Sequence, residues 1–163
     1  MDTWTKTFRS TYTVTRDDRA IAQVSFSGWG RAARVTGDGI DWTIARHGLL
    51  HQTVTVRTRD GVTLATARGR FSGSYDLTTR DGFTARFKMN GWCGRYAWVA
   101  SDRTPLITFA LEKWYRQNRT IDVRVSVADE TLLLVLGAVL AKFTDDDMTA
   151  TSIAVVAAAA AGA

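Results

Sequence analysis

The sequence has only one cysteine and one proline in 163 residues. A single cysteine, Cys93, excludes an intrachain disulfide, so nothing in the sequence requires an oxidising compartment. With 45% hydrophobic and 23% charged residues, the low proline content argues against long disorder and favours one compact domain over residues 1–163. The first ten residues lack the apolar segment of a secretory signal. We therefore expect a cytoplasmic protein, with peripheral attachment to a membrane left open.

The sequence also lacks the motifs of common catalytic and metal sites. It contains no H-E-x-x-H, phosphate-binding loop or G-x-S-x-G elbow. The stretch GWGRAA at 28–33 fits a dinucleotide-binding pattern but leads into RVTGDG instead of a helix, and GWCG at 91–94 lacks a second cysteine. His47 and His51 have the spacing of a helical metal pair, but Gly48 and the surrounding strand pattern break it. We expect no enzyme, no cofactor and no metal site.

Most of the sequence alternates between apolar and polar residues, which is typical of β-strands with one solvated face. Clear examples of the apolar face are Ile40, Trp42 and Ile44; Val54 and Val56; Phe83, Ala85, Phe87 and Met89; and Ile121, Val123, Val125 and Val127. Turn sequences separate these segments: RDDR at 16–19, GDG at 37–39, RDG at 59–61 and 80–82, NG at 90–91 and QN at 117–118. This pattern predicts an antiparallel meander.

Segments between turns give about twelve strands over residues 3–127, with boundary errors of about 2 to 4 residues. The strands are expected to begin near residues 3, 11, 20, 31, 39, 51, 62, 74, 83, 94, 105 and 120. An antiparallel sheet of this size tends to close on itself, because open edges invite aggregation and long twisted sheets curl. We therefore predict an all-β fold, a closed barrel of roughly twelve strands.

A different pattern begins at Asp129. Residues 131–141 are apolar on every side and follow the acids Asp129 and Glu130, which favour a helix start over about 129–143. A helix without a polar face must be buried, and these eleven residues extend only about 16 Å, too short to cross a bilayer. A barrel of twelve strands is too wide for its own side chains to fill. We predict that this helix fills the lumen; an interfacial or membrane-inserted helix and a strand are the alternatives.

The sequence after Asp145–Asp147 forms a second apolar segment, MTATSIAVVAAAAAGA, at 148–163. Its alanines suit a helix packed against a neighbour, and Ile153, Val155 and Val156 suit a short terminal strand. A membrane anchor is the functional interpretation. We expect the three acids to interrupt the structure and the tail to pack outside the barrel or fray.

At this level of detail the chain resembles the tubby-like C-terminal fold of tubby proteins, phospholipid scramblases and plant LURP-one-related proteins, as a short, bacterial-type member. The resemblance covers about residues 3–143. It is carried by the RDG hairpins, by GRYAWVA and LITFALEKW, and by VRVSVADETLLLVLGAVLAKF, in which a strand leads directly into an apolar helix. It implies a twelve-stranded barrel threaded by a hydrophobic helix, and family members bind phosphoinositides. The sequence lacks the acidic calcium cluster and cysteine-rich segment of scramblases, so scrambling activity is not implied.

The net charge of +5 favours anionic partners such as phospholipid head groups or nucleic acid. By alternation, Arg57 and Arg59 project outward from one strand and Arg86 and Lys88 from another. Guanidinium groups bind phosphate in a bidentate way, so we predict these four residues as a binding patch for anionic lipid. No element that reads nucleic-acid grooves is recognisable.

Two functional hypotheses follow. The first is a non-enzymatic binding or scaffold protein that attaches to anionic phospholipid at a membrane surface. The alternative is a lipocalin-like carrier that holds an apolar small molecule in the barrel lumen. The position of the apolar helix separates them, because a helix inside the lumen leaves no room for a carried ligand.

Overall fold

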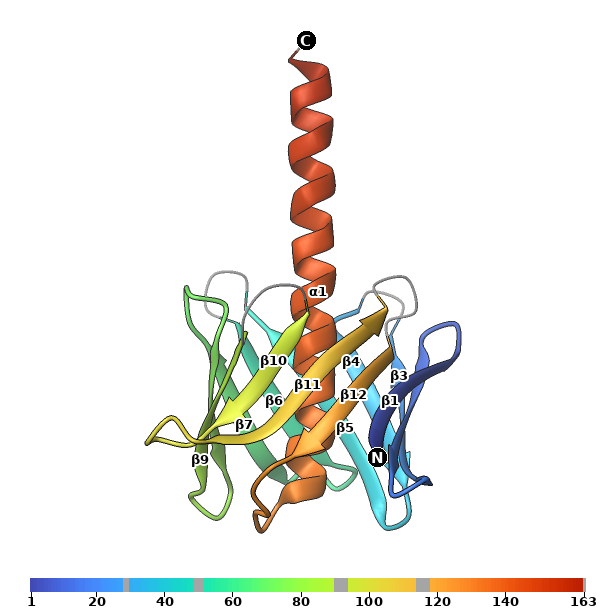
Figure 1. Ribbon diagram of the computed structural model, residues 1–163, viewed down its shortest axis with the longest axis vertical. Coiled ribbons are helices and arrows are strands. Elements are labelled where there is room, and N and C mark those ends of the chain that lie inside the picture. Colours follow the sequence, from blue (N-terminus) through green and yellow to red (C-terminus); the bar gives the residue numbers. More distant parts are fainter. Residues whose placement is uncertain (28–29, 49–51, 90–93, 114–117, 163) are drawn as a thin grey trace.

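The computed structural model of this chain describes residues 1–27, 30–48, 52–89, 94–113 and 118–162. Within these ranges twelve antiparallel strands form a closed barrel, and one long helix runs through it (Figure 1). The strands are β1 Asp2–Phe8, β2 Thr11–Arg16, β3 Arg19–Phe26, β4 Ala32–Gly37, β5 Ile40–His47, β6 Thr53–Thr58, β7 Thr63–Gly69, β8 Tyr75–Thr79, β9 Thr84–Met89, β10 Arg95–Val99, β11 Pro105–Lys113 and β12 Asn118–Val123. The helix, α1, spans Glu130–Ala161.

The strand order follows the chain order around the barrel, as the alternation predicted. Each strand pairs with its sequence neighbours, and β1 closes the barrel by pairing with β12, with Asp2 opposite Ile121 and Trp4 opposite Arg119. Every strand begins within about two residues of its expected start. The predicted fold, a closed antiparallel barrel with one buried helix, is confirmed.

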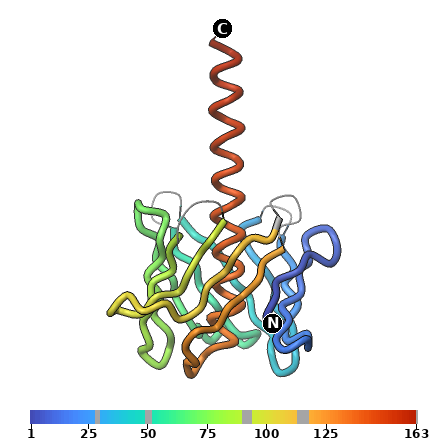
Figure 2. The backbone as a smooth tube through the Cα atoms, in the orientation of Figure 1, coloured from blue at the N-terminus to red at the C-terminus, as the bar shows by residue number. Residues whose placement is uncertain are grey.

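The core lies between the inner face of the barrel and the first half of α1. Inward side chains of alternate strand positions, such as Val24, Ile44 and Val56, are fully buried, and so is almost every helix residue between Leu132 and Phe143. The helix thus fills the lumen, as expected from its apolar surface on every side (Figure 2). One of its residues, Gly137, lies against aromatic rings: a Cβ there would come within 2.6 Å of Phe109 Cε2 and 2.5 Å of Trp98 Nε1.

Three expectations about the end of the chain were wrong. The last strand ends at Val123, so Val125 and Val127 do not continue it, and Val125 is 41% exposed. Asp129 occupies the N-cap position of α1 but its side chain makes no capping hydrogen bond. The acids Asp145–Asp147 do not interrupt the helix.

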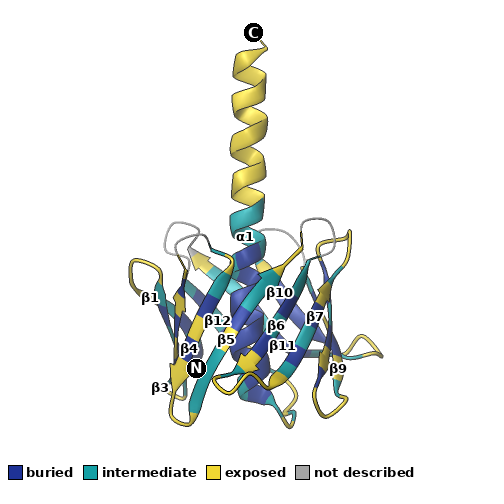
Figure 3. Cartoon of the chain, turned by 180° about the vertical axis from the view of Figure 1, so that it is seen from behind, coloured by how far each residue is buried: buried dark blue, intermediate teal, exposed yellow. Residues whose placement is uncertain are grey.

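Instead, α1 continues for 32 residues, about 48 Å, and its second half leaves the barrel and projects away from it (Figure 1). Every residue from Met148 to Ala161 is exposed (Figure 3). The tail therefore neither packs on the outside of the barrel nor forms a strand. We call the end of the barrel where the helix leaves, near Asp145–Asp147, the exit end, and the opposite end, near Glu130, the entry end.

Candidate functional site

The three acids that precede the exposed tail form ion pairs at the exit end, and we call these residues and their partners the collar. Asp145 pairs with Arg119 of β12, and its other oxygen accepts a hydrogen bond of 2.5 Å from the Tyr96 hydroxyl of β10. Arg119 is 1% exposed; it also donates to the Gly94 carbonyl at 3.1 Å and lies over the Tyr96 ring. This pairing ties the helix to one side of the barrel.

The other two acids make contacts elsewhere in the collar. Asp147 Oδ2 lies 2.7 Å from Arg46 Nη1 of β5, whose guanidinium stacks on the Phe143 ring. Asp146 pairs at 2.6 Å with Lys142 one turn earlier, and the Lys142 ammonium lies over the Phe26 ring of β3. The collar thus fixes the helix against strands on different sides of the barrel and neutralises the acids before the tail begins.

Tyrosines next to the collar are held in their neutral form. Burial raises the pKa of Tyr96, and its hydrogen bond to Asp145 adds to the effect. Burial, together with the charge of Asp146, raises the pKa of Tyr12 to about 12. The pKa of Tyr75 is also raised by burial. An elevated tyrosine pKa supplies no acid or base near neutral pH, so these groups have a structural role at the exit end.

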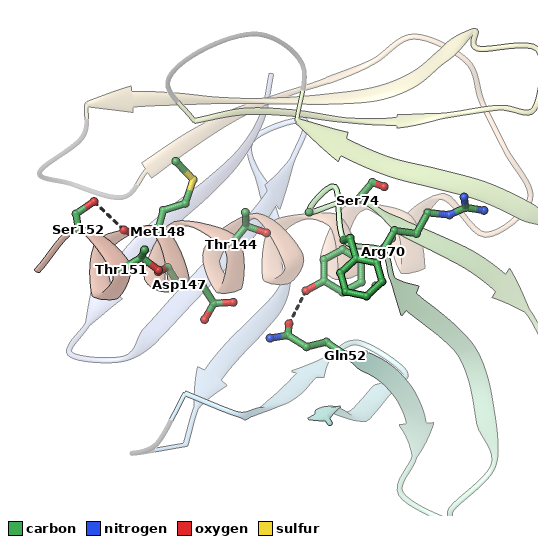
Figure 4. A pocket seen from close by; sticks show the side chains of 12 residues that line it. Gln52, Arg70, Ser74, Thr144, Asp147, Met148, Thr151 and Ser152 are labelled. Carbon is green, nitrogen blue, oxygen red and sulfur yellow. Dashed lines mark hydrogen bonds between the residues drawn. The ribbon is translucent and has the colours of Figure 1, made fainter. Parts of the chain in front are cut away.

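A groove of about 530 Å³ lies beside the helix where it leaves the barrel (Figure 4). Its walls are the turn after β7 and the helix from Thr144 to Ser152, and the Tyr75 hydroxyl donates to Gln52 Oε1 at 3.0 Å. The guanidinium of Arg70 points away from Asp147 and the hydroxyl groups. The groove therefore offers hydroxyl groups and an already paired carboxylate, without a free cation directed into it.

The charges of the described residues are separated along the barrel axis. Every hairpin turn at the entry end contains aspartate: Asp17 and Asp18, Asp38, Asp60, Asp81 and Asp102. Three of these turns also contain an arginine, Arg59, Arg80 or Arg103. The strand ends and turns described at the exit end carry two acids, Asp76 and Glu112, against the cations Lys6, Arg9, Arg31, Arg46, Arg68, Arg70, Lys88, Arg95 and Arg119. The collar acids Asp145–Asp147 lie at this end as well. Successive turns of a meander lie at opposite ends of a barrel, so this sequence pattern gives the molecule a basic end and a more acidic end.

Several cations at the exit end are available to a partner. Lys6, Arg9, Arg31 and Arg95 are exposed and take part in none of the ion pairs among the described residues. Two exposed aromatic side chains lie at the same end: Phe8, the last residue of β1, is 68% exposed, and Phe71, in the turn after β7, is 88% exposed. We call these four cations, the two phenylalanines and the tail Met148–Ala161 the exit surface.

The structure does not bring the four residues predicted from alternation into one patch. Arg57 is exposed on β6, but Arg59 lies in the turn after that strand, at the entry end. Arg86 and Lys88 lie on β9, and Lys88 is half-buried. Strands β7 and β8 separate the two pairs, and the register places Arg86 level with Thr53 instead of Arg57.

Arg86 and Lys88 do line a shallow groove of about 490 Å³ with Arg70 and Arg103, around Asp76. Arg86 Nε lies 2.8 Å from Asp76, which also pairs with Arg70. Partial burial raises the pKa of the Asp76 carboxyl, but the hydrogen bonds from Arg86 and Arg70 more than offset this and hold it below its usual value. Asp76 stays ionised at neutral pH and competes with any anion for both guanidinium groups.

A third groove, of about 780 Å³, lies at the entry end around the start of α1. Its lining includes Arg16, whose guanidinium pairs at 2.6 Å with Glu130, and the Ser126 hydroxyl donates to the same carboxylate at 3.2 Å. The pairing of Arg16 with Glu130 fixes the helix start, whereas Arg80, Asp81 and Asp129 in the same lining take part in none of the ion pairs among the described residues.

The catalytic and metal interpretations that the sequence made improbable receive no support from these residues. Among the described residues no group of three His, Cys, Asp or Glu side chains could hold a metal ion. His51 and Cys93 lie outside the described residues. No helix within the described ranges combines the length and the apolar character needed to cross a bilayer.

Comparison with known proteins gives no relative: no family model, no curated protein and no solved structure matches this chain.

Proposed function

We propose that this chain is a non-enzymatic membrane-binding protein whose exit surface attaches to bilayers that contain anionic phospholipid. The observation that carries the proposal is that the exposed apolar helix leaves the barrel at the end where Lys6, Arg9, Arg31 and Arg95 lie exposed with no ion-pair partner among the described residues. The hairpin turns of the other end carry aspartates, three of them beside arginines. Each Lys or Arg near an anionic membrane contributes about 1 kcal/mol, so a few such residues suffice to orient the barrel.

The exit surface is a better candidate than the patch predicted from alternation. Lys6, Arg31 and Arg95 have no carboxylate partner among the described residues, whereas Arg86 is bound to Asp76. The mixed charge of the entry-end turns weakens the case for Arg59, which lies beside Asp60. A membrane would therefore approach the barrel along its axis and not against the side of the sheet.

The fold supports a tubby-like assignment as part of this proposal, since a barrel threaded by a hydrophobic helix is what the resemblance implies. The carrier hypothesis loses its basis, because the helix side chains occupy the lumen where a ligand would be held. A cytoplasmic location with peripheral attachment is the corresponding cellular proposal.

Sedimentation with vesicles tests the proposal. We expect the protein to pellet with phosphatidylcholine vesicles that contain phosphatidylserine, and to be released as salt rises, because exposed charges are screened beyond a Debye length of about 8–10 Å. Arg31→Glu combined with Arg95→Glu should weaken this binding at least about tenfold. The matched control, Arg57→Glu with Arg59→Glu, makes the same change of charge away from the exit surface and should have a much smaller effect.

The opposite ranking of the two double variants would return the site to the patch around Arg57 and Arg59. A wild-type protein that ignores anionic vesicles at low salt would refute membrane binding altogether. Vesicles of equal negative charge made with phosphatidylserine or with a phosphoinositide distinguish binding at a specific head-group site from attraction by the overall positive charge. A specific head-group site prefers one lipid, whereas a diffuse positive field follows charge density.

A further inference from the structure

The polarity of α1 changes along its axis after the helix leaves the barrel. The charged collar acids Asp145–Asp147 come first, the hydroxyl residues Thr149, Thr151 and Ser152 follow, and from Ile153 to Ala161 every side chain is apolar. Charged, polar and apolar layers follow one another in the same order from water through the head groups into the hydrocarbon of a bilayer. A helix that docks on a protein surface instead varies in polarity around its circumference.

The apolar part of the tail, from Ile153 to Ala161, has no polar face. Successive residues of an α-helix are rotated by about 100°, so Ile153 and Val156 lie about 60° apart and Val155 lies about 160° from Ile153. Alanines at 154 and 157–161 cover the remaining directions. Ile153, Val155 and Val156 are 63–69% exposed. A second copy packed on one side would leave the alanines of the other side in water, whereas hydrocarbon surrounds the whole apolar helix.

The hydroxyl groups near the start of the tail are already satisfied within the helix. Thr149 donates to the Asp145 carbonyl, Thr151 to the Asp147 carbonyl and Ser152 to the Met148 carbonyl, each at 2.9 Å. Polar groups without a partner are costly in an apolar medium, and this return bond to the preceding turn removes that cost. The tail thus carries no side-chain donor that requires water.

From these features we infer that Met148–Ala161 inserts into the bilayer hydrocarbon, with the collar at the level of the head groups and the barrel outside. The segment is about 21 Å long, shorter than a hydrocarbon core of about 30 Å, so it enters the bilayer without crossing it. Phe8 and Phe71 at the exit end would then lie at the interface, where aromatic rings are favoured. This inference rests on the proposed membrane binding and adds how deeply the tail enters the bilayer and how the barrel is oriented on it.

Site-specific fluorescence tests the insertion in the full chain. In a Cys93→Ser background, single cysteines at Val155 and at Ser101 are labelled with an environment-sensitive fluorophore; Ser101 is exposed in the entry-end turn after β10. With vesicles of phosphatidylcholine and phosphatidylserine, the label at 155 should shift to the blue and be quenched by lipids brominated on their acyl chains. The label at 101 should change in neither respect.

A second variant tests the contribution of the apolar side chains. Replacing Ile153, Val155 and Val156 by glutamine keeps the helix propensity and the charge but should weaken vesicle binding at least about tenfold. Val62→Gln with Val125→Gln is the matched control, since both valines are about two-fifths exposed in segments at the entry end. This control should bind vesicles like the wild type, and both variants should unfold at the wild-type temperature.

The outcomes are distinguishable. Absence of sedimentation with anionic vesicles defeats the proposed function itself. Normal sedimentation with a label at 155 that remains in water, and with wild-type binding by the glutamine variant, overturns the insertion while leaving surface attachment intact. A blue-shifted label without vesicles, together with a dimer mass in solution, also overturns it and shows that a second copy covers the tail.

Discussion

The two halves of α1 are both apolar but have opposite surroundings. Residues from Leu132 to Ala141 are enclosed by the barrel, whereas Met148–Ala161 are exposed on every side. The first half contributes the centre of the hydrophobic core, while the second depends on the high helix propensity of alanine and on continuity with an anchored helix. The apolar side chains that stabilise the fold thus lie in the first half of α1, and those of the second half remain available for contact with bilayer hydrocarbon.

The largest difference in stability should appear between variants that carry an aspartate in the first half of α1 and variants that carry one in the second half. Leu134→Asp or Leu136→Asp buries an unpaired carboxylate at a cost of several kcal/mol, comparable with a total stability of about 5–15 kcal/mol. Val155→Asp puts the carboxylate in water and should change the free energy of unfolding by less than about 0.5 kcal/mol. Urea unfolding followed by tryptophan fluorescence measures both. A soluble, cooperatively folded Leu134→Asp protein would show that the lumen does not depend on this helix.

The collar, where the two halves meet, should show a smaller effect that differs between its sides. Asp145→Asn leaves the buried guanidinium of Arg119 without a counter-charge and should cost about 3–5 kcal/mol. Asp147 is 47% exposed, so Asp147→Asn should cost about 1 kcal/mol or less. Equal losses of stability in urea would mean that the two pairs contribute alike. Arg119→Met with Asp145→Leu should recover most of the loss, since it removes both charges together.

A third contrast between the halves concerns glycine. In an exposed helix, Gly→Ala stabilises by about 1 kcal/mol. At Gly137 the added methyl group would meet Phe109 and Trp98, so Gly137→Ala should instead destabilise by about 1–3 kcal/mol. It should also disturb the 2.8 Å hydrogen bond from Trp98 Nε1 to the Leu133 carbonyl, which is visible as a change in tryptophan emission. A rise in stability would indicate a looser lumen than the structure has.

Alkaline pH tests the tyrosines at the exit end of the buried half. Folding raises the pKa of Tyr12 to about 12 from 10, and also raises the pKa of Tyr96 and Tyr75. The folded protein therefore retains protons that the unfolded chain loses above pH 10, so stability is full below that value and falls as pH rises through 10 to 12. Absorbance of tyrosinate should appear together with unfolding. Early ionisation of Tyr12, Tyr75 and Tyr96 in a folded protein would contradict their burial.

Much of the barrel was predictable because strand and turn patterns are local. Alternation and Asp-Gly turns set the strand starts to within about two residues, and the unbroken apolar surface of 131–141 required burial. The sequence did not predict the continuation of α1, because three adjacent acids suggest the end of an apolar helix. The basic partners of two of these acids follow from alternation: Arg46 points inward like Ile44 on the same strand, and Arg119 points inward like Ile121.

The basic character of the exit end could also be predicted from the sequence, because the odd- and even-numbered turns of the meander differ in charge. Every second connection of a meander lies at the same end, and the aspartates occupy one set of these connections. In the sequence the other set contains Trp29, Leu49, Leu50, Trp92 and Trp114, whose positions the structure does not describe. The patch of Arg57, Arg59, Arg86 and Lys88 was predicted from which face of a strand each residue occupies. That criterion does not show how charge is distributed between the two ends of the barrel.

The smallest effect on stability, with the largest on function, should come from removing the second half alone. A chain that stops after Ser152 keeps the collar and one further turn but loses Ile153 and the residues beyond it. Those residues are exposed, so the free energy of unfolding should fall by less than about 1 kcal/mol, mainly because the collar acids then lie closer to the negative end of the helix dipole.

The same truncated protein should lose most of its binding to anionic vesicles. A truncated chain that binds as well as the full one would assign attachment to the exit-end cations alone, and one that no longer folds would show that the tail supports the barrel.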